Sequence, residues 1–561
     1  MSVLFVDIET DPTRHDVAIP RVSIVTTALD DGAPVIRAPG EAADFIRDFI
    51  RAGGAIVGHN LPFDLTCLGI KPGRTYDTYI RDVLLGAASG RHADASSSLK
   101  KIAARFGIPM PKKDKSLTLS FGGHTVETIS PEQRAYAMDD IIVTREVFKR
   151  QGGLTRVSPD EERQTALSYN IFQMARMGVH VDRDRVLQMK VRADVQVKML
   201  RDRVLAHGLI VAAGPKSDPW AKERLSRKLV QARLKAAGVT KLPKRRATDT
   251  RDPSGLLAAD GETLRGTGDP GLVVLADYLE ATKWASLVKA FDTGTDTIRA
   301  WWRPLVASGR LSCGGPNLTQ VPRVGGLREC LIPRDGNVLV VMDFSALEFR
   351  VWAATCVRWL GYSEAAKMLH RFRHDPGAVH GVVAREIMAT LGGEFPARRQ
   401  QAKAMNYGLI GGMSIGRLAD TLGCTRDEAA PLERAWRGVF WEFASYKNYV
   451  LRQKVGGGKC EVVLPSGRAR VAFPTEILNV VIQGGGADVA KDCLRLAQQA
   501  ALPVVALPHD EFIIDVPESW AEEVGHEIVR CAEEAGRMHY PEVPWTGNEF
   551  QVVRAWPSKK A

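Results

Sequence analysis

The stretch Ala506-Leu507-Pro508-His509-Asp510-Glu511-Phe512-Ile513-Ile514-Asp515 lies near the C-terminus of the chain. Two apolar runs, Val504–Leu507 and Phe512–Ile514, flank the acidic pair Asp510-Glu511. Apolar runs on either side of a short polar turn predict a tight β-hairpin with carboxylates at its tip. Adjacent carboxylates are costly to remove from water unless a cation lies beside them. Taken alone, the motif is best interpreted as an ordinary acidic turn, and its meaning depends on the other segments.

A second acidic residue lies at the end of an apolar strand. The run Val338–Met342 is typical of a buried strand, and it ends at Asp343 before a helix that continues through Ala353. We therefore expect Asp343 to lie beside the carboxylates of the hairpin. Ser345 and Glu348 have the spacing of a capping box, so helix capping is a sufficient structural explanation for Glu348.

Between these acidic residues lies a basic helix. In Pro396–Gly408 the residues Arg399, Lys403 and Tyr407 recur every four positions and share one face. A basic helix face is usually only solvated. Two cations followed by an aromatic ring and the glycine-rich segment Gly408–Gly412 also suit a nucleoside triphosphate, because the cations meet phosphates and the ring packs on sugar and base.

The bulk composition limits the class of protein. The 561 residues are too many for one core, so about three or four domains are expected. A content of 45% hydrophobic and 25% charged residues is ordinary for a soluble globular protein, and the net charge of +11 suggests a polyanionic partner. Eight scattered cysteines without a Cys-x-x-Cys pair argue against a zinc module or a disulfide scaffold and fit a reducing compartment. We expect no transmembrane helix, and no signal peptide because the strand-like run Val3–Val6 begins at once.

Acidic residues also follow predicted strands in the N-terminal part. Val3–Val6 leads into Asp7-Ile8-Glu9, and residues two apart in a strand share a face, so Asp7 and Glu9 point one way while Ile8 points into the core. A second strand, Ala55–Asn60, leads into the segment that contains Asp64. Taken singly, each of these acidic residues is best interpreted as an exposed strand end.

A helix start follows at Ser130–Gln133, with Ser at the N-cap, Pro at the first position and Gln at the third. On this helix Tyr136 and Asp140 are four residues apart and share a face. Four carboxylates brought to one place would repel one another unless divalent cations neutralise them. Two such cations, held by oxygen ligands, can activate a water and stabilise the leaving oxygen of a phosphodiester.

Two further segments carry polar side chains suited to DNA. Arg310–Pro322 is polar and turn-rich, and Phe473–Val489 predicts a helix start followed by a glycine run, with Asn479 and Gln483 on one face. Glycines at 484–486 are costly in a helix, so they indicate close approach of a backbone or a nucleic acid. Arginine and amide side chains can reach the minor-groove acceptors that every base pair presents.

Taken together, these segments resemble the DNA polymerases of family A, the group of bacterial DNA polymerase I and many phage replicative enzymes. The resemblance extends from residue 3 to about residue 556. The three acidic segments at the N-terminus resemble the exonuclease motifs of the proofreading family. The other matching segments are motif A (Asp343–Arg350), motif B (Arg399–Gly412), motif C (His509–Glu511), the primer–template segment (Arg310–Pro322) and the entry to the thumb (Met174–Asp182).

The resemblance implies an α/β multidomain fold. A ribonuclease H-like 3′→5′ exonuclease domain would be followed by a right-hand polymerase with an antiparallel palm sheet and helical fingers and thumb. The implied domains are exonuclease 1–152, thumb 160–290, palm 291–356 and 476–561, and fingers 357–475. Because the exonuclease motif begins at residue 7, we expect no 5′-nuclease domain before it and a phage-type replicative enzyme.

In the polymerase site, the resemblance makes Asp343 and Asp510 the ligands of two Mg²⁺ (or Mn²⁺), helped by the Phe344 carbonyl. Arg399 and Lys403 would bind the triphosphate, and Lys403 would also donate a proton to the departing pyrophosphate.

The other nucleotide contacts follow from the same resemblance. Glu348 would block the 2′-hydroxyl of ribonucleotides, and Tyr407 would pack on the nucleotide. His380 is similar to a triphosphate-contacting histidine, and an ordinary surface helix residue is an equal alternative.

The resemblance also implies DNA contacts. His509 and Glu511 would support the primer end and the metal site, and a basic loop in the thumb would contact duplex phosphates irrespective of sequence. A solvated loop is the alternative for that segment. The complete set of implied DNA-binding residues is Arg310, Asn317, Gln320, Lys244, Arg245, Arg246, Asn479, Gln483, His509 and Glu511.

In the exonuclease site, the resemblance makes Asp7, Glu9, Asp64 and Asp140 the ligands of two divalent ions (Mg²⁺, Mn²⁺ or Zn²⁺). Tyr136 would position the attacking water.

The implied partners are primer–template DNA and dNTPs, together with replisome proteins such as a helicase-primase and a single-strand binding protein. We expect a monomer without membrane attachment in the cytoplasm, which for a phage-encoded enzyme is that of the bacterial host.

Two positions depart from many relatives. Tyr407 stands where bacterial members often have Phe, and its phenol can replace the hydrogen bond of the substrate 3′-hydroxyl, so we expect good acceptance of dideoxynucleotides. Gly411 stands where many members have Tyr, which leaves template stacking at that point open.

Three other functions fit parts of the sequence. A single-subunit RNA polymerase shares the palm motifs, but Glu348 and the complete exonuclease set count against it. A catalytically silent DNA-binding protein is disfavoured because Asp343, Asp510, Arg399 and Lys403 are all present. A standalone exonuclease would leave most of the chain without a role.

Overall fold

Two separate β-sheets carry the acidic residues singled out in the sequence. The computed structural model describes residues 1–91, 97–110, 115–212, 223–240, 257–365, 378–410 and 413–557. The described chain divides into two compact units, the first formed by Met1–Val179, Arg299–Thr319 and Pro333–Trp556, the second by His180–Ile298 and Gln320–Ile332. The α/β class is confirmed, whereas the four-domain division stays a prediction.

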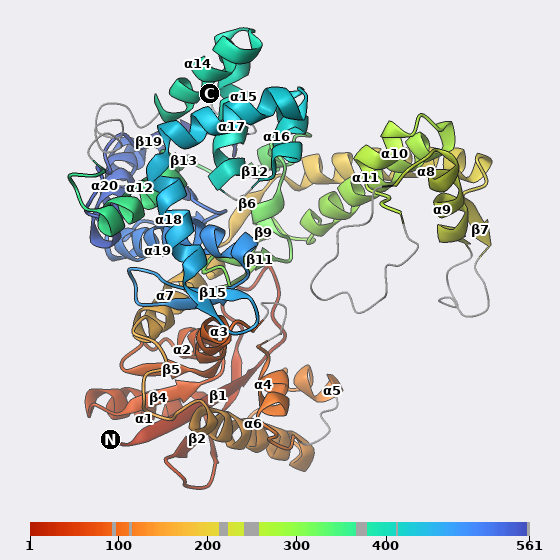
Figure 1. Ribbon diagram of the computed structural model, residues 1–561. Coiled ribbons are helices and arrows are strands. Elements are labelled where there is room, and N and C mark those ends of the chain that lie inside the picture. Colours follow the sequence, from red (N-terminus) through yellow and green to blue (C-terminus); the bar gives the residue numbers. More distant parts are fainter. Residues whose placement is uncertain are drawn as a thin grey trace. The chain divides into compact units, whose positions relative to one another are not determined.

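The N-terminal sheet has five strands in the order β3-β2-β1-β4-β5. Strands β2 and β3 run antiparallel to their neighbours, and β4 and β5 run parallel to β1. The elements of this part, coloured red to orange in Figure 1, are β1 (Val3–Thr10), β2 (Val22–Leu29), β3 (Val35–Arg37), α1 (Pro39–Arg51), β4 (Ala55–Gly58), α2 (Leu61–Cys67), β5 (Thr75–Asp77), α3 (Thr78–Ala88), α4 (Leu99–Arg105), α5 (Lys115–Thr118), α6 (Pro131–Arg150) and α7 (Glu161–Met177).

The alternation of side chains along β1 gives this sheet two buried faces. Leu4, Val6 and Ile8 pack in a core with residues of α1 and α2. Val3 and Phe5 point the other way, into a core with residues of α6. Asp7 and Glu9 continue the parity of Val3 and Phe5, so they lie on the face that α6 covers. The prediction that Ile8 points into the core is confirmed.

The C-terminal sheet has four antiparallel strands in the order β17-β18-β13-β19. Its elements are β13 (Asn337–Asp343), β17 (Val504–Ala506), β18 (Glu511–Pro517) and β19 (Glu549–Val553), with the helices α12 (Leu347–Leu360), α19 (Pro474–Gln499) and α20 (Ala521–His539). The predicted hairpin and the predicted strand at Val338–Met342 are therefore confirmed. Glu511 is the first residue of β18, so only Asp510 of the acidic pair lies in the turn.

A helical segment separates the two halves of this sheet in the sequence. Its elements are α14 (Ala378–Leu391), α15 (Phe395–Ile410), α16 (Ile415–Leu422), α17 (Arg426–Val439) and α18 (Trp441–Arg452). The remaining elements of the first unit are β10 (Trp301–Arg303), β11 (Ser312–Gly314), β14 (Lys454–Val455), β15 (Lys459–Val463), β16 (Ala469–Ala472) and η3 (Glu518–Trp520), and the short helix η1 (Leu318–Gln320) lies at the boundary of the units.

The second unit is built around two long helices that lie side by side, α8 (Arg183–Ala206) and α11 (Pro270–Phe291) (Figure 1). Its other elements are β6 (Val179–Val181), β7 (Ile210–Ala212), β8 (Glu223–Leu225), α9 (Arg227–Ala236), α10 (Gly261–Gly266), β9 (Thr297–Ile298), η2 (Arg328–Cys330) and β12 (Leu331–Ile332). Among the described helices of the chain, none combines the length and apolar character needed to cross a membrane.

The glycine run at 484–486 lies inside α19, which continues through it to Gln499. A side chain at Gly484 would come within 2.9 Å of the Ser308 carbonyl oxygen, and one at Gly485 within 2.1 Å of the Tyr540 hydroxyl. The close approach inferred from the sequence therefore involves other parts of the chain.

A charged network is buried between α7, α19 and the turn before β16. Asp160, Asp488 and Asp492 are its acids, and Arg163, Arg468 and Lys491 are its bases. Lys491 is completely buried and donates a hydrogen bond to Gln164 Oε1 at 2.8 Å. Burial and the nearby charge of Arg468 lower the pKa of Lys491 to about 7, with Arg163 adding to the effect and Asp488 and Asp160 opposing it.

This shift predicts a specific pH dependence of stability. In the unfolded chain a lysine has a pKa of about 10.4, so between about pH 7 and pH 10 the unfolded state binds more protons and stability rises with pH. Lys491→Met removes this contribution. The difference in free energy of unfolding, wild type minus variant, should therefore rise from pH 7 to pH 10 and be flat below about pH 6.

Urea titrations of both proteins across this pH range measure the difference. Lys454→Met, a change at an exposed lysine of β14, is the matched control and should leave the pH profile unchanged. A difference between wild type and Lys491→Met that is the same at pH 6 and pH 10 contradicts the prediction.

Candidate functional site

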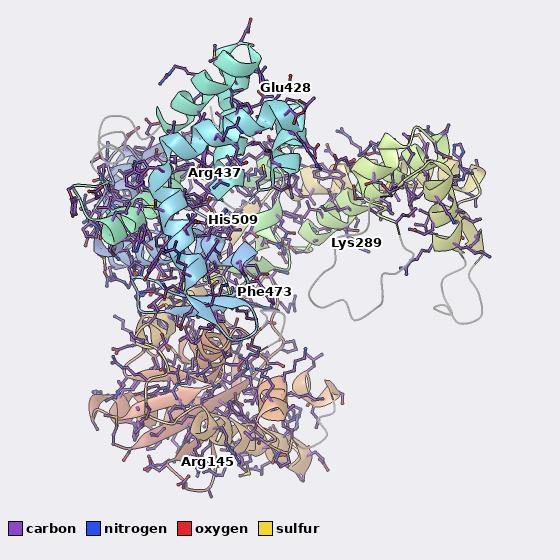
Figure 2. The ribbon with its side chains drawn as sticks, viewed as in Figure 1. Arg145, Lys289, Glu428, Arg437, Phe473 and His509 are labelled. Carbon is purple, nitrogen blue, oxygen red and sulfur yellow. The ribbon has the colours of Figure 1, made fainter. Side chains whose placement is uncertain are left out.

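The antiparallel pairing of β13 and β18 brings together the acidic residues of the C-terminal part. Asp343 is the last residue of β13 and lies directly opposite Glu511. The backbone N–H of Phe344 donates to the Asp510 carbonyl oxygen at 3.4 Å. His509, labelled in Figure 2, has a φ of 66°, and this left-handed conformation turns the chain into the strand.

Asp510 is half-buried among other charged groups. Burial and then the charges of Asp343 and Glu348 raise the pKa of Asp510 to about 7, and Arg310 partly opposes the shift. Oxygen ligands that repel one another in a buried position are the donor set that a hard divalent cation neutralises. The residues present therefore fit a Mg²⁺ or Mn²⁺ site.

Glu348 corrects an expectation, because it does not form a capping box with Ser345. Helix α12 begins at Leu347, its N-cap is Ala346 in the left-handed conformation, and no side chain caps it. Glu348 instead accepts a hydrogen bond from Arg310 Nη2 at 2.6 Å. Burial raises the pKa of Glu348, and the charge and hydrogen bond of Arg310 oppose the shift.

The predicted basic stripe lies on α15, which contains Arg399, Lys403 and Tyr407. Arg399 and Lys403 are exposed, whereas Tyr407 is half-buried and packs edge-on against Phe349 with ring centroids 5.3 Å apart. Burial and then the charges of Glu348, Asp510 and Asp343 raise the pKa of the Tyr407 phenol. The ring therefore lies beside the acidic group.

The other predicted nucleotide and DNA contacts have different surroundings. His509 Nε2 lies 2.8 Å from the Thr319 carbonyl oxygen, and Asn317 Oδ1 accepts a hydrogen bond from the Thr319 hydroxyl at 2.7 Å. Gln320 is exposed in η1, and Asn479 lies in α19. His380 lies in α14. The remaining positions, Lys244, Arg245, Arg246 and Gly411, lie outside the described residues.

Arg310 and Gln483 both lie beside Asp510 of the C-terminal acidic group. Together with Glu348, Lys491 and Asp510 they line a cavity of about 30 Å³, which is large enough for roughly one water. Lys491 of the buried charged network therefore lines the same cavity as the predicted DNA contacts Arg310 and Gln483.

Two residues that support the strand end were missed in the sequence. Arg350 is completely buried and donates to the carbonyl oxygens of Ser345 at 2.8 Å, Thr546 at 2.7 Å and Pro544. Asn548 Oδ1 accepts a hydrogen bond from the Ser345 backbone at 3.0 Å. The available signal was a charged residue among the apolar residues of a buried helix.

The second acidic group lies on the N-terminal sheet. Carboxylate oxygens of Asp7, Glu9 and Asp140 all lie within 4.8 Å of one another, with Asp7 and Glu9 from β1 and Asp140 from α6. The predicted cap holds α6 in place, because the Ser130 hydroxyl accepts from the Gln133 N–H while the Gln133 side chain accepts from the Ser130 N–H. The oxygen donors present therefore fit a divalent cation.

Asp64, on α2, is not one of the three residues whose carboxylate oxygens gather within 4.8 Å of one another. Its Oδ1 accepts a hydrogen bond from the Ile8 backbone at 3.1 Å, and burial followed by the charge of Asp7 raises its pKa well above the usual value. Tyr136 lies on α6, half-buried, with its ring 6.0 Å from that of Phe121.

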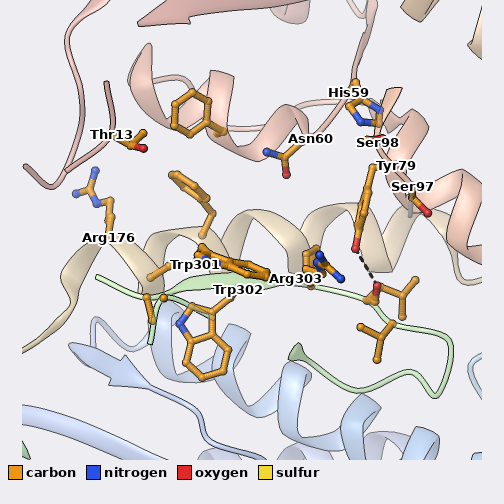
Figure 3. Close-up of a pocket in the computed structure, with 18 of the residues that line it drawn as sticks. Thr13, His59, Asn60, Tyr79, Ser97, Ser98, Arg176, Trp301, Trp302 and Arg303 are labelled. Atoms are coloured by element: carbon orange, nitrogen blue, oxygen red, sulfur yellow. Dashed lines mark hydrogen bonds between the residues drawn. The ribbon is translucent and has the colours of Figure 1, made fainter. Parts of the chain in front are cut away.

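A large cleft of about 1010 Å³ opens beside α2 (Figure 3). Asn60 and Phe63 line it at the start of the helix that carries Asp64, and Trp301 and Arg303 line its opposite wall. The Arg303 guanidinium lies 5.1 Å from the centre of the Trp301 ring. The cleft therefore combines exposed aromatic rings with positive charge.

Comparisons with known proteins give matches over most of the chain. The family model described as DNA polymerase family A matches residues 240–556. The DNA polymerase I of Aquifex aeolicus (strain VF5) is 29% identical over 535 residues, which cover 89% of this chain and 87% of that protein. The DNA polymerase I of Pseudomonas aeruginosa is 25% identical over 535 residues, and the chain spans 55% of its length.

A solved structure shares the fold. The POL domain of Pol1 from M. smegmatis, in complex with DNA primer-template and dNTP, matches with a TM-score of 0.68 and 20% identity, covering 99% of this chain and 95% of that chain. Because the family model matches more than half of the sequence, the chain belongs to DNA polymerase family A.

Proposed function

We propose that the chain extends a DNA primer by two-metal nucleotidyl transfer and trims the same strand with a separate 3′→5′ exonuclease site. As a member of family A, the chain is a DNA-directed DNA polymerase. The proposal adds the mechanism and the second activity. The observation that carries it is that two acidic groups lie on two different sheets, Asp343 with Asp510 on one and Asp7, Glu9 and Asp140 on the other.

In the polymerase site, Asp343, Asp510 and the Phe344 carbonyl would hold two Mg²⁺ or Mn²⁺ ions. Bound ions of this kind lower the pKa of an attacking hydroxyl and neutralise triphosphate charge. The pairing of β13 with β18 holds both carboxylates at one edge of the sheet, so the protein fixes the geometry before substrate arrives.

The nucleotide would lie along α15. Arg399 and Lys403 are exposed on this helix and would bind phosphate, with Lys403 holding the proton for the departing pyrophosphate. Tyr407 and Glu348 would contact the sugar, where Glu348 excludes a 2′-hydroxyl. His380 on α14 would contact the triphosphate.

DNA would be bound through side chains that approach the minor groove. Arg310 and Gln483 line the cavity next to Asp510, which suits contact with the primer terminus. The other proposed contacts are Asn317, Gln320, Asn479, His509, Glu511 and the basic residues Lys244, Arg245 and Arg246.

In the exonuclease site, Asp7, Glu9, Asp64 and Asp140 would hold two divalent ions, and Tyr136 would position the attacking water. The adjacent cleft supports this assignment, because stacked aromatic rings and arginines bind single-stranded nucleic acid irrespective of sequence. A frayed primer 3′ end would enter along Trp301 and Asn60.

The biological setting is also part of the proposal. The substrates would be primer–template DNA and dNTPs, which are bound in the M. smegmatis structure. We propose a monomeric phage-type replicative enzyme that acts in the host cytoplasm with replisome proteins such as a helicase-primase.

The two sites predict that the two activities are separable. Asp343→Asn should lower primer extension by about a hundredfold or more while primer degradation continues, because it removes charge only from the polymerase site. Asp7→Ala should do the reverse. A labelled primer–template assayed with Mg²⁺, with and without dNTPs, measures both activities. Loss of both activities from either single change in a folded protein would refute the two-site proposal.

Tyr407 predicts the response to dideoxynucleotides. If its phenol replaces the missing 3′-hydroxyl, Tyr407→Phe should lower the incorporation of ddNTPs relative to dNTPs by about tenfold, the equivalent of one hydrogen bond. Competition between the two nucleotides on one template measures the ratio. Phe349→Leu, which changes the ring that packs on Tyr407 but not the phenol, is the control. Equal ratios for wild type and Tyr407→Phe contradict the prediction.

A further inference from the structure

The charged network around α19 has no role in the reaction described above. An ion network buried in an apolar core is costly to desolvate, and stability alone is a weak explanation for it. Asp488, Lys491 and Asp492 are almost completely buried on one helix, and Arg468 reaches this helix from the turn before β16. Arg468 is the network member that also contacts the backbone beside the polymerase site.

The Arg468 guanidinium is held by two carboxylates. Its Nη1 donates to Asp488 Oδ1 at 2.8 Å and to Asp160 Oδ2 at 3.0 Å, and its Nη2 donates to Asp488 Oδ2 at 3.1 Å. Only 5% of the residue is exposed. Burial alone would raise the pKa of Asp488, but the charges of Arg468, Arg163 and Lys491 outweigh it and keep that pKa below its usual value. This paired, bidentate geometry fixes the plane of the guanidinium.

The same guanidinium supports two backbone segments. Nη2 also donates to the Gly484 carbonyl oxygen at 3.3 Å. A Cβ on Gly309 would lie 2.4 Å from Nη2 and 3.2 Å from the Gly484 Cα, so Gly309 and Gly484 both pack closely against it. Gly309 has a φ of 88°, a left-handed value that favours glycine.

These two glycines adjoin the proposed DNA contacts. Gly309 precedes Arg310, and Gly484 follows Gln483. Arg310 and Gln483 line one cavity together with Asp510, although Arg310 and Gln483 are 173 positions apart in the sequence. The guanidinium is therefore a shared support for two residues that approach the acidic group from different segments.

We propose that Arg468 is a positioning residue, which locks the backbone at Gly309 and Gly484 and thereby aims Arg310 and Gln483 at the primer terminus beside Asp510. The proposal rests on the proposed function, in which these two side chains contact DNA. A lysine cannot replace this arginine, because an ammonium group is a single point charge and cannot hold both carboxylates and the Gly484 carbonyl in one plane.

Arg468→Lys tests the proposal while keeping the positive charge. Single-turnover extension of a matched primer at saturating dNTP should fall about tenfold or more, because displaced contacts misalign the primer end. Exonuclease activity on a single-stranded oligonucleotide should stay at the wild-type level and reports that the protein is folded.

A double-mutant cycle separates positioning from general structural damage. If Arg468 acts through its two neighbours, Arg468→Lys should have little further effect in an Arg310→Ala/Gln483→Ala background. If it instead lowers the rate by the same factor in both backgrounds, the proposal is overturned. If Arg310→Ala/Gln483→Ala alone extends primers like wild type, the assigned DNA contacts are wrong and the proposal falls with them.

Arg163→Lys is the matched control. Arg163 contacts both acids that hold Arg468, Asp160 at 2.7 Å and Asp488 at 2.8 Å, and it also contacts Asp492 at 2.6 Å. Of the contacts found for its side chain in the described residues, none reaches Gly309 or Gly484. Extension by Arg163→Lys should remain within about twofold of wild type, and a loss equal to that of Arg468→Lys would overturn the proposal.

Gly484→Ala is a second variant that leaves every charge in place. The added Cβ would lie 2.9 Å from the Ser308 carbonyl oxygen and 3.4 Å from Arg468 Nη2, so it pushes apart the segments that Arg468 supports. It should give the same non-additive loss of extension as Arg468→Lys. If Arg468→Lys does not fold, this variant decides the question, and a wild-type extension rate for a folded Gly484→Ala protein overturns the proposal.

Discussion

The C-terminal acidic group depends on the pairing of β13 with β18. In this ladder Asp343 lies opposite Glu511. Four of the five apolar residues Val338–Met342 lie opposite apolar residues of β18, and the fifth, Leu339, lies opposite Asp515. The buried apolar run is bounded by the polar residues Asn337 and Asp343, so a shift of one residue would carry a polar side chain into the core. The burial of this apolar run therefore fixes the register, and the register in turn places Asp343 beside Asp510. The placement of Asp343 beside Asp510 is therefore a consequence of core packing, not of the acidic residues themselves.

Both acidic groups are built by the same physical means on different sheets. A buried strand delivers one or two carboxylates to a defined face, and a residue distant in sequence completes the group. Burial and mutual repulsion raise the pKa of Asp64 at one site and of Asp510 at the other. A divalent cation bound at either site would therefore reduce the repulsion between its carboxylates.

The sequence predicted those parts of the sites that depend on local pattern. The hairpin around Asp510, the strand that ends at Asp343 and the capping box at Ser130 follow from hydrophobic periodicity and turn chemistry, and the structure contains all three. The pairing of Glu348 with Arg310 could not be predicted in this way. The local spacing of Ser345 and Glu348 fits a capping box. In the structure, however, Ala346 is left-handed and the helix begins at Leu347, so the Glu348 carboxylate pairs with Arg310, 38 residues away in the sequence.

The glycines of α19 show why long-range packing escapes a sequence pattern. Each glycine in a helix interior costs about 1 kcal/mol relative to alanine, so the run had to permit some close approach. The sequence could not tell DNA from protein as the approaching group. The structure brings the Ser308 carbonyl against Gly484 and the Tyr540 hydroxyl against Gly485, from segments on either side of the helix in sequence. Helix α19 is therefore anchored beside Gln483 by the chain itself, and the side chain of Gln483 is left to face the cavity next to Asp510.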